Sequence, residues 1–231
     1  MDGPREDLSQ RGCEERRHPI FARFFDRLSR CSEREVGVYR DRLLEGLCGR
    51  VLEVGAGNGV NFGRYPPTVE EVVALEPEPF MRRKAQRAAT TAPVAVRVVD
   101  GVASRLPFES SSFDAAVASL VLCSVPDLDA ALMELRRVLA DGGELRFLEH
   151  VRADNPVKAR LQRLLDRKGI WPLLGGGCHC SRSTIAAIAA AGFRVRECES
   201  LAFGPSWWIT NPHVRGAALA PGEALANSSC V

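Results

Sequence analysis

The stretch VLEVGAGNG, from Val51 to Gly59, constrains the fold of this chain more than any other part of the sequence. An apolar run leads straight into three glycines at alternate positions, Gly55, Gly57 and Gly59. Glycine adopts positive φ at no steric cost and lets the backbone come close to a ligand. A strand that ends in such a turn predicts the first unit of a ligand-binding α/β sheet.

Apolar runs and amphipathic stretches alternate through the next hundred residues. After the strand at 50–54, continuous apolar runs predict strands at 71–76, 94–99, 113–120 and 144–150. The stretches between them predict helices at 79–89 and 128–139, the second closed by a Gly-Gly pair. Strands without polar alternation are typical of a sheet that helices cover on both faces.

The rhythm changes after Val151. We expect a helix at 156–168, then a glycine-rich loop, WPLLGGGCHC, and a helix that Ser181 caps. A strand at 193–200 and a last segment at about 207–219 are predicted to pair antiparallel. The fold class predicted is therefore α/β, with a Rossmann-like, mostly parallel seven-stranded sheet, a C-terminal antiparallel strand and helices on both faces.

The N-terminal part divides into a polar tail at 1–19 and helices at 20–48. The first helix is predicted from Phe21, Phe24, Phe25 and Leu28, which share one face, and the second from Ser32 and Glu35, which form a capping box. We expect the first helix to close over the ligand as a lid. The chain is predicted to end in a short tail at 221–231.

Composition excludes several classes of function. The chain carries 31 basic and 29 acidic residues without a basic stripe, so we expect no nucleic-acid partner. No apolar run approaches the length of a membrane span, and the polar N-terminus has no apolar segment of a secretory signal. We therefore expect a cytoplasmic protein without a membrane anchor.

Eight cysteines in a chain of this length predict free thiols in a reducing compartment. The triplet Cys178-His179-Cys180 offers metal ligands, but no second close pair such as CxxC follows, and a structural zinc site takes four ligands. We therefore predict no metal site. Cys123 is expected to be a small buried apolar side chain rather than a nucleophile.

Two acids distinguish between ligands for the glycine turn. Glu53, two residues before Gly55, would repel a pyrophosphate and suit a cationic ligand. S-adenosylmethionine is such a ligand, since it carries a sulfonium and an ammonium group and no phosphate. Glu76, at the end of the second predicted strand, is placed to accept hydrogen bonds from both ribose hydroxyls, although dinucleotide folds share that feature.

Three stretches now identify a resemblance. Together with the glycine turn, LPFESSSFDAAVASL at 106–120 and ELRRVLADGG at 134–143 resemble class I S-adenosylmethionine-dependent methyltransferases that act on small molecules. More narrowly, SLVLCSVPD, FLEHV and GGGCHCSRST resemble the methyltransferase-like alkyl-thiol S-methyltransferases. The resemblance implies a methyltransferase domain at 49–220 with S-adenosylmethionine as cofactor.

The resemblance also implies the site. The cofactor-binding residues would be Glu53, Gly55, Ala56, Gly57, Asn58, Gly59, Glu76, Pro77, Gly101, Val102, Ala103, Ser119 and Leu120. His150 and Glu149 end the fifth strand, on the expected acceptor side, and His150 is the predicted general base. A purely structural role for His150, in which its side chain orients a loop, is the equally weighted alternative.

The resemblance implies transfer of a methyl group by in-line displacement to a small apolar acceptor, with a thiol as the leading choice. O-, N- or C-methylation of a quinone or phenol and a NAD(P)-dependent oxidoreductase are the alternatives, since a fold does not settle a reaction. A cofactor-binding module without catalysis is a third class.

Overall fold

The computed structural model describes residues 22–23, 26–27, 29, 33–204 and 207–222. The predicted tail at 1–19, the face formed by Phe21, Phe24, Phe25 and Leu28, and the N-cap Ser32 lie outside these residues, as does most of the predicted tail at 221–231. Where the domain borders fall stays a prediction.

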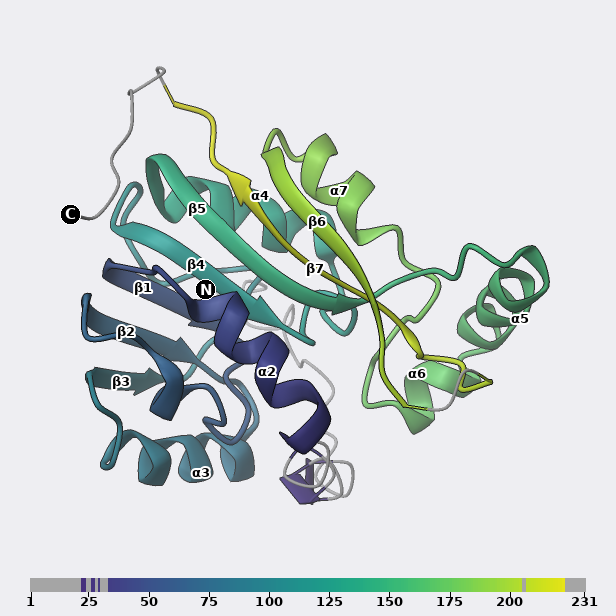
Figure 1. The fold of residues 1–231 in the computed structure, drawn as a ribbon, viewed down its shortest axis with the longest axis horizontal. Coiled ribbons are helices and arrows are strands. Elements are labelled where there is room, and N and C mark those ends of the chain that lie inside the picture. The colour runs from purple at the N-terminus through teal and green to yellow at the C-terminus, as the bar shows by residue number, and fades with distance from the viewer. Residues whose placement is uncertain (1–21, 24–25, 28, 30–32, 205–206, 223–231) are drawn as a thin grey trace, which may run out of the picture.

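Seven strands form one sheet in the order β3-β2-β1-β4-β5-β7-β6 (Figure 1). Their bounds are β1 Gly49–Val54, β2 Val69–Leu75, β3 Ala95–Val99, β4 Phe113–Ser119, β5 Leu139–His150, β6 Arg194–Ala202 and β7 Pro212–Leu219. Strands β1 to β5 pair in parallel, whereas β7 runs antiparallel to both of its neighbours. The predicted fold class is confirmed.

Helices cover both faces of the sheet, as predicted. The helices are α2 Glu33–Leu44, α3 Pro79–Ala89, α4 Leu128–Val138, α5 Pro156–Arg167, α6 Ile170–Leu174 and α7 Thr184–Ala190, and a 3-10 turn η2 spans Phe62–Arg64. Apolar residues of α4 and α7 pack in one core cluster, and those of α2, η2 and α3 pack in a second. In Figure 1, α5 and α6 extend beyond the ends of β6 and β7.

Three local predictions were wrong. The segment WPLL, expected in a loop, is the short helix α6, whose N-cap Gly169 takes the left-handed conformation that glycine favours. Helix α7 begins after Ser183, not after Ser181. Helix α4 ends at Val138 and leads into β5 at Leu139, so Gly142 and Gly143 lie within an extended strand rather than stopping the helix.

The sheet topology brings distant segments to one edge. The carboxyl ends of β1, β4 and β5 lie side by side, since these strands pair in parallel. The reversed strand β7 adds its first residues there, with His213 paired to His150. Ligands of open α/β sheets bind beyond this edge, which therefore holds the candidate site.

Candidate active site

The turn after β1 has the conformation that its glycines predict. Gly55, Gly57 and Gly59 have φ of 62°, 59° and 80°. A Cβ atom on Gly55 would lie 2.3 Å from Cγ2 of Val121, in the segment after β4. Two loops thus approach so closely that only glycine fits between them.

Glu76 holds this turn from the end of β2. Its carboxylate accepts hydrogen bonds from the N–H groups of Gly57, at 2.7 Å, and Glu78, at 2.9 Å. The side chain is buried, and burial raises the pKa of Glu76 to about 7. Since a carboxylate can accept about four hydrogen bonds, Glu76 retains lone pairs for two ligand hydroxyls.

Glu53 lies beneath the turn. The sequence predicts that its carboxylate faces the ligand, but the side chain is buried. It is 2% exposed, and its two oxygens accept hydrogen bonds from Nδ2 of Asn61, at 2.8 Å, and from the hydroxyl of Tyr65, at 2.7 Å. Burial raises the pKa of Glu53 to about 7, against these hydrogen bonds and the charge of Arg40. The acid therefore shapes the turn through its neighbours.

Arg40 is a residue of this site that the sequence interpretation missed. From α2 its Nη1 donates to Oδ1 of Asn61, at 3.0 Å, and to Oγ of Ser119, at 2.9 Å. It is buried on the helix face that also carries Val36 and Leu43. An arginine on an otherwise apolar helix face was the signal that could have found it, because buried arginines are rare without partners.

The other predicted cofactor residues lie around this framework. Asn58 donates its side-chain amide to Asp26 and Ser29, which ties the turn to the N-terminal segment. Leu120 follows β4 with a φ of 59°, a conformation that a bulky residue adopts only under constraint. Ala56 and Ala103 are buried in the core; Pro77, Gly101 and Val102 lie in the loops after β2 and β3.

The buried carboxyl of Glu53 predicts a pH-dependent stability. In the unfolded chain this group ionises near pH 4.5 and in the folded chain near 7, so the folded state keeps its proton longer. The wild-type free energy of unfolding should therefore fall by about 3 kcal/mol, relative to Glu53→Gln, as the pH rises from 4.5 to 7.

Urea denaturation of both proteins at several pH values measures this difference. Glu70→Gln, which replaces an exposed carboxylate on β2, is the control and should parallel the wild type. Equal pH profiles of the Glu53→Gln variant and the wild type would contradict the assignment.

Glu149, which the sequence places beside His150 on the acceptor side, organises a loop. Its Oε1 accepts from the N–H groups of Val121, at 3.0 Å, and Leu122, at 2.9 Å, and its Oε2 from that of Cys123, at 3.1 Å. The residue is fully buried, and burial raises the pKa of its carboxyl group well above the usual range. The carboxyl group thereby holds the backbone of the loop after β4.

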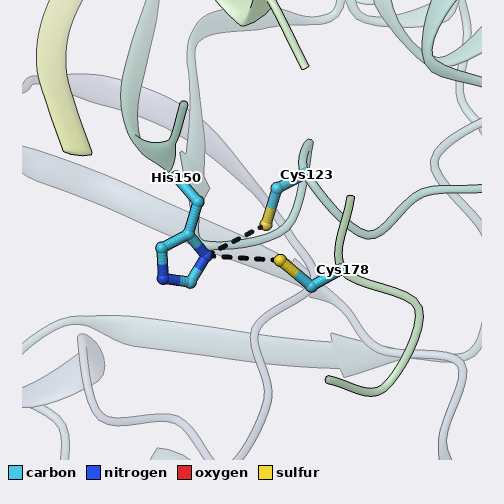
Figure 2. Close-up of side chains that lie close together, drawn as sticks. All are labelled: Cys123, His150 and Cys178. Atoms are coloured by element: carbon cyan, nitrogen blue, oxygen red, sulfur yellow. Dashed lines mark hydrogen bonds between the residues drawn. The ribbon is translucent and has the colours of Figure 1, made fainter. Parts of the chain in front are cut away.

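His150, the predicted base, faces two cysteines with one ring nitrogen (Figure 2). Its Nδ1 is 3.5 Å from Sγ of Cys123 and 3.5 Å from Sγ of Cys178. Both cysteines are buried, as expected for Cys123, and the neighbouring Cys178 together with burial raises the pKa of the Cys123 thiol well above its usual range. The sequence interpretation did not bring these three residues together.

An open groove of about 1150 Å³ adjoins this cluster. Its lining includes Val151, Leu161, Trp207, Ile209 and His213. The ring of His213 lies 4.4 Å from that of His150, centroid to centroid. Charged side chains such as Arg152, Asp154 and Lys158 also line it, so the groove is partly apolar, and it begins where β5 ends.

The prediction that the cysteines are free thiols holds for four of them and is wrong for Cys48. Cys123, Cys178, Cys180 and Cys198 are free, whereas Cys48 is disulfide-bonded. Among the residues that the structure describes, no helix has both the length and the apolar character needed to cross a bilayer.

The strand order, the reversed β7 and the glycine turn with its acid at the end of β2 are the features of a class I methyltransferase. A family model described as "Methyltransferase domain" matches residues 52–147. Human thiol S-methyltransferase TMT1A is 33% identical over 173 residues, which cover 73% of this chain and 70% of that protein. The chain belongs to the S-adenosylmethionine-dependent methyltransferases, in the family that includes TMT1A.

Two further comparisons agree. Demethylmenaquinone methyltransferase of Thermus thermophilus is 31% identical over 184 residues, covering 71% of this chain and 82% of that protein. The crystal structure of the [4+2]-cyclase SpnF superposes with a TM-score of 0.66 at 20% identity, covering 82% of each chain, which shows a shared fold. Because the chain belongs to this family, the alternative function of a nicotinamide-dependent oxidoreductase is excluded.

Proposed function

We propose that this enzyme transfers the methyl group of S-adenosylmethionine to the sulfur of a small apolar thiol. The observation that carries the proposal is the partly apolar groove that begins at Val151, next to His150, on the edge of the sheet shared with the glycine turn. The relatives named thiol S-methyltransferases support the choice of sulfur. A cytoplasmic location is part of the same proposal.

The protein residues would act by binding and alignment. Bound S-adenosylmethionine supplies an electrophilic methyl group, so the chain needs to orient two ligands and exclude water. Glu76 would hold the ribose hydroxyls, the backbone at Gly55, Gly57 and Asn58 would face the methionine part, and Ser119 and Leu120 would close on it. Pro77 and the segment 101–103 would line the adenine, and the described residues near Asp26 support a lid over the turn.

A second acceptor class has its own support. A relative that covers 71% of this chain is named a demethylmenaquinone methyltransferase, and an apolar groove also suits a quinone ring. Carbon or oxygen methylation is therefore the alternative function.

Incubation with labelled S-adenosylmethionine and matched thiols, phenols and quinones distinguishes the two. Aryl and alkyl thiols should be methylated at least tenfold faster than the corresponding alcohols. Methylation of quinones or phenols alone would support the alternative, and cofactor binding without any product would make the chain a binding module.

Glu76→Ala is expected to weaken S-adenosylmethionine binding at least tenfold, or about 1.4 kcal/mol, because charge-assisted hydrogen bonds to the ribose are lost. Isothermal titration calorimetry measures the change. Glu70→Ala removes an exposed acid near the other end of the same strand and should bind like the wild type. Unchanged affinity in Glu76→Ala would remove the ribose assignment.

A further inference from the structure

Three side-chain atoms that can bind a metal ion converge at the edge of the site where the acceptor would lie. Nδ1 of His150 and the sulfurs of Cys123 and Cys178 all lie within 4.8 Å of one another (Figure 2). They come from three separate segments: the end of β5, the loop after β4 and the loop between α6 and α7. Chain topology, and not sequence proximity, creates this cluster.

The spacing of the cluster matches tetrahedral coordination. Zinc binds sulfur at about 2.3 Å and imidazole nitrogen at about 2.0–2.1 Å, so two such ligands of a tetrahedral site lie roughly 3.5 Å apart. Both Nδ1–Sγ distances are 3.5 Å. A hydrogen bond explains the arrangement less well, because Nδ1 has either one proton or one lone pair and faces two sulfurs.

The backbone holds the two cysteines in place. The N–H of Cys123 donates to Glu149, and its carbonyl accepts from the N–H of His179 at 2.7 Å. The N–H of Cys178 donates to the carbonyl of Gly175. A Cβ on Gly177 would lie 3.2 Å from the carbonyl oxygen of Ser124, so the two cysteine loops pack closely. Ligands fixed in this way need little reorganisation to bind an ion.

The charges also balance. Cys123 and Cys178 are 1% and 5% exposed, and burying two thiolates without a partner is costly. A divalent cation with two thiolates and a neutral imidazole forms a centre of zero net charge. Two thiolates and an imidazole are soft and borderline ligands, which favour zinc over magnesium or calcium.

We propose that Cys123, His150 and Cys178 bind one zinc ion, whose fourth position takes the sulfur of the acceptor thiol. Three protein ligands and one open position are typical of catalytic rather than structural zinc. This inference rests on the proposed thiol acceptor and revises the prediction that the chain has no metal site. It also changes the role of His150, since a coordinated Nδ1 cannot act as a base.

The position of the cluster suits this role. Val121, which contacts the glycine turn at Gly55, lies only two residues before Cys123. The loop after β4 therefore joins the donor site to the metal ligands. On the other side, Val151 and His213 connect His150 to the apolar groove, where the rest of the acceptor would lie.

The reaction balances without a change of oxidation state. The acceptor thiol binds zinc through sulfur and releases its proton to solvent. A lone pair of that sulfur forms the new bond to the methyl carbon, while the bond from this carbon to the donor sulfonium breaks and its electron pair stays on the donor sulfur. The products are a methyl thioether, S-adenosylhomocysteine and one proton, and the neutral thioether leaves as a weaker ligand.

Metal analysis of the full-length protein tests the inference. After dialysis against zinc and then buffer, the wild type should retain about one zinc per chain, and Cys123→Ser, Cys178→Ser and His150→Ala should retain less than about a tenth of that. Cys180→Ser is the matched control, because Cys180 is buried in the same loop and contacts Asp166 instead. It should retain zinc like the wild type.

Cobalt substitution gives a readout that does not depend on activity. The cobalt protein should show thiolate charge-transfer absorption in the near ultraviolet, and addition of hexanethiol should increase it as a third thiolate binds. Removal of zinc from the wild type with dipicolinate should lower thiol methylation at least tenfold, reversibly on adding zinc. Because the removal of zinc is carried out on the wild-type protein, this measurement tests the inference even if a variant fails to fold.

Three results would overturn the inference. They are retention of zinc by the Cys123 and Cys178 variants, a Cys123–Cys178 disulfide in the purified active protein, and full thiol methylation by the zinc-free chain. The last result would leave the proposed function intact. Methylation of quinones or phenols alone by the zinc-loaded chain would instead reject the thiol acceptor, and with it the open coordination position.

Discussion

Gly55→Ala is expected to weaken S-adenosylmethionine binding about 100-fold. The left-handed conformation of residue 55 costs an alanine about 1–2 kcal/mol, and the collision of its Cβ with Val121 costs about 1–3 kcal/mol more. The turn would have to shift away from the ligand. Calorimetric titration of the purified variant measures the change in affinity.

Gly46→Ala separates the effect of backbone strain from the effect of the collision with Val121. Gly46 also has a positive φ, of 74°, but no atom lies within 4 Å of the added Cβ. This control should lose about 1 kcal/mol of stability from backbone strain and bind the cofactor like the wild type. If both variants bind normally, the close approach of the two loops does not position the ligand.

Glu149→Ala is expected to lower the free energy of unfolding by about 3–5 kcal/mol. The substitution leaves three buried N–H groups, those of Val121, Leu122 and Cys123, without their acceptor, and each unsatisfied group costs about 1–3 kcal/mol before the loop relaxes. Chemical denaturation at neutral pH measures the loss. Turnover should fall as well, because the same loop links both sides of the site.

Two variants sharpen this test. Glu149→Gln keeps one oxygen for two of the three N–H groups and should lose less stability than the alanine variant. Glu109→Ala removes an exposed glutamate and should stay within about 0.5 kcal/mol of the wild type. A stable Glu149→Ala protein that has lost only turnover would restore Glu149 as a residue that contacts substrate.

The fold was predictable because its signals are local. Continuous apolar runs located the first four strands to within two residues, whereas β5 begins five residues before and β7 five residues after the predicted start. Pro79 at the start of α3 and the glycines after β1 marked the turns. The short helix α6 was missed because WPLL is followed by three glycines, which favour a loop, whereas Gly169 before it begins the helix. Such a one-turn helix depends on its neighbours more than on its own residues.

The site was predictable only in part. Glu76 and the glycine turn follow from strand ends, which the sequence marks. Arg40 lies on a helix, 21 residues before Asn61 in the chain, and nothing local connects the two. Cys123, His150 and Cys178 are farther apart still, and the search for zinc ligands failed because it looked for close pairs in sequence.

The reversal of β7 has a consequence for how such an enzyme diversifies. Strands β1 to β3 carry the donor half of the edge, and β5 with the hairpin of β6 and β7 carries the other half, with β4 shared between them. Substitutions accumulating beyond residue 150 can therefore remodel the accepted substrate while the donor half is inherited unchanged. One ancestral scaffold could in this way serve many acceptors without rebuilding its machinery for methyl donation.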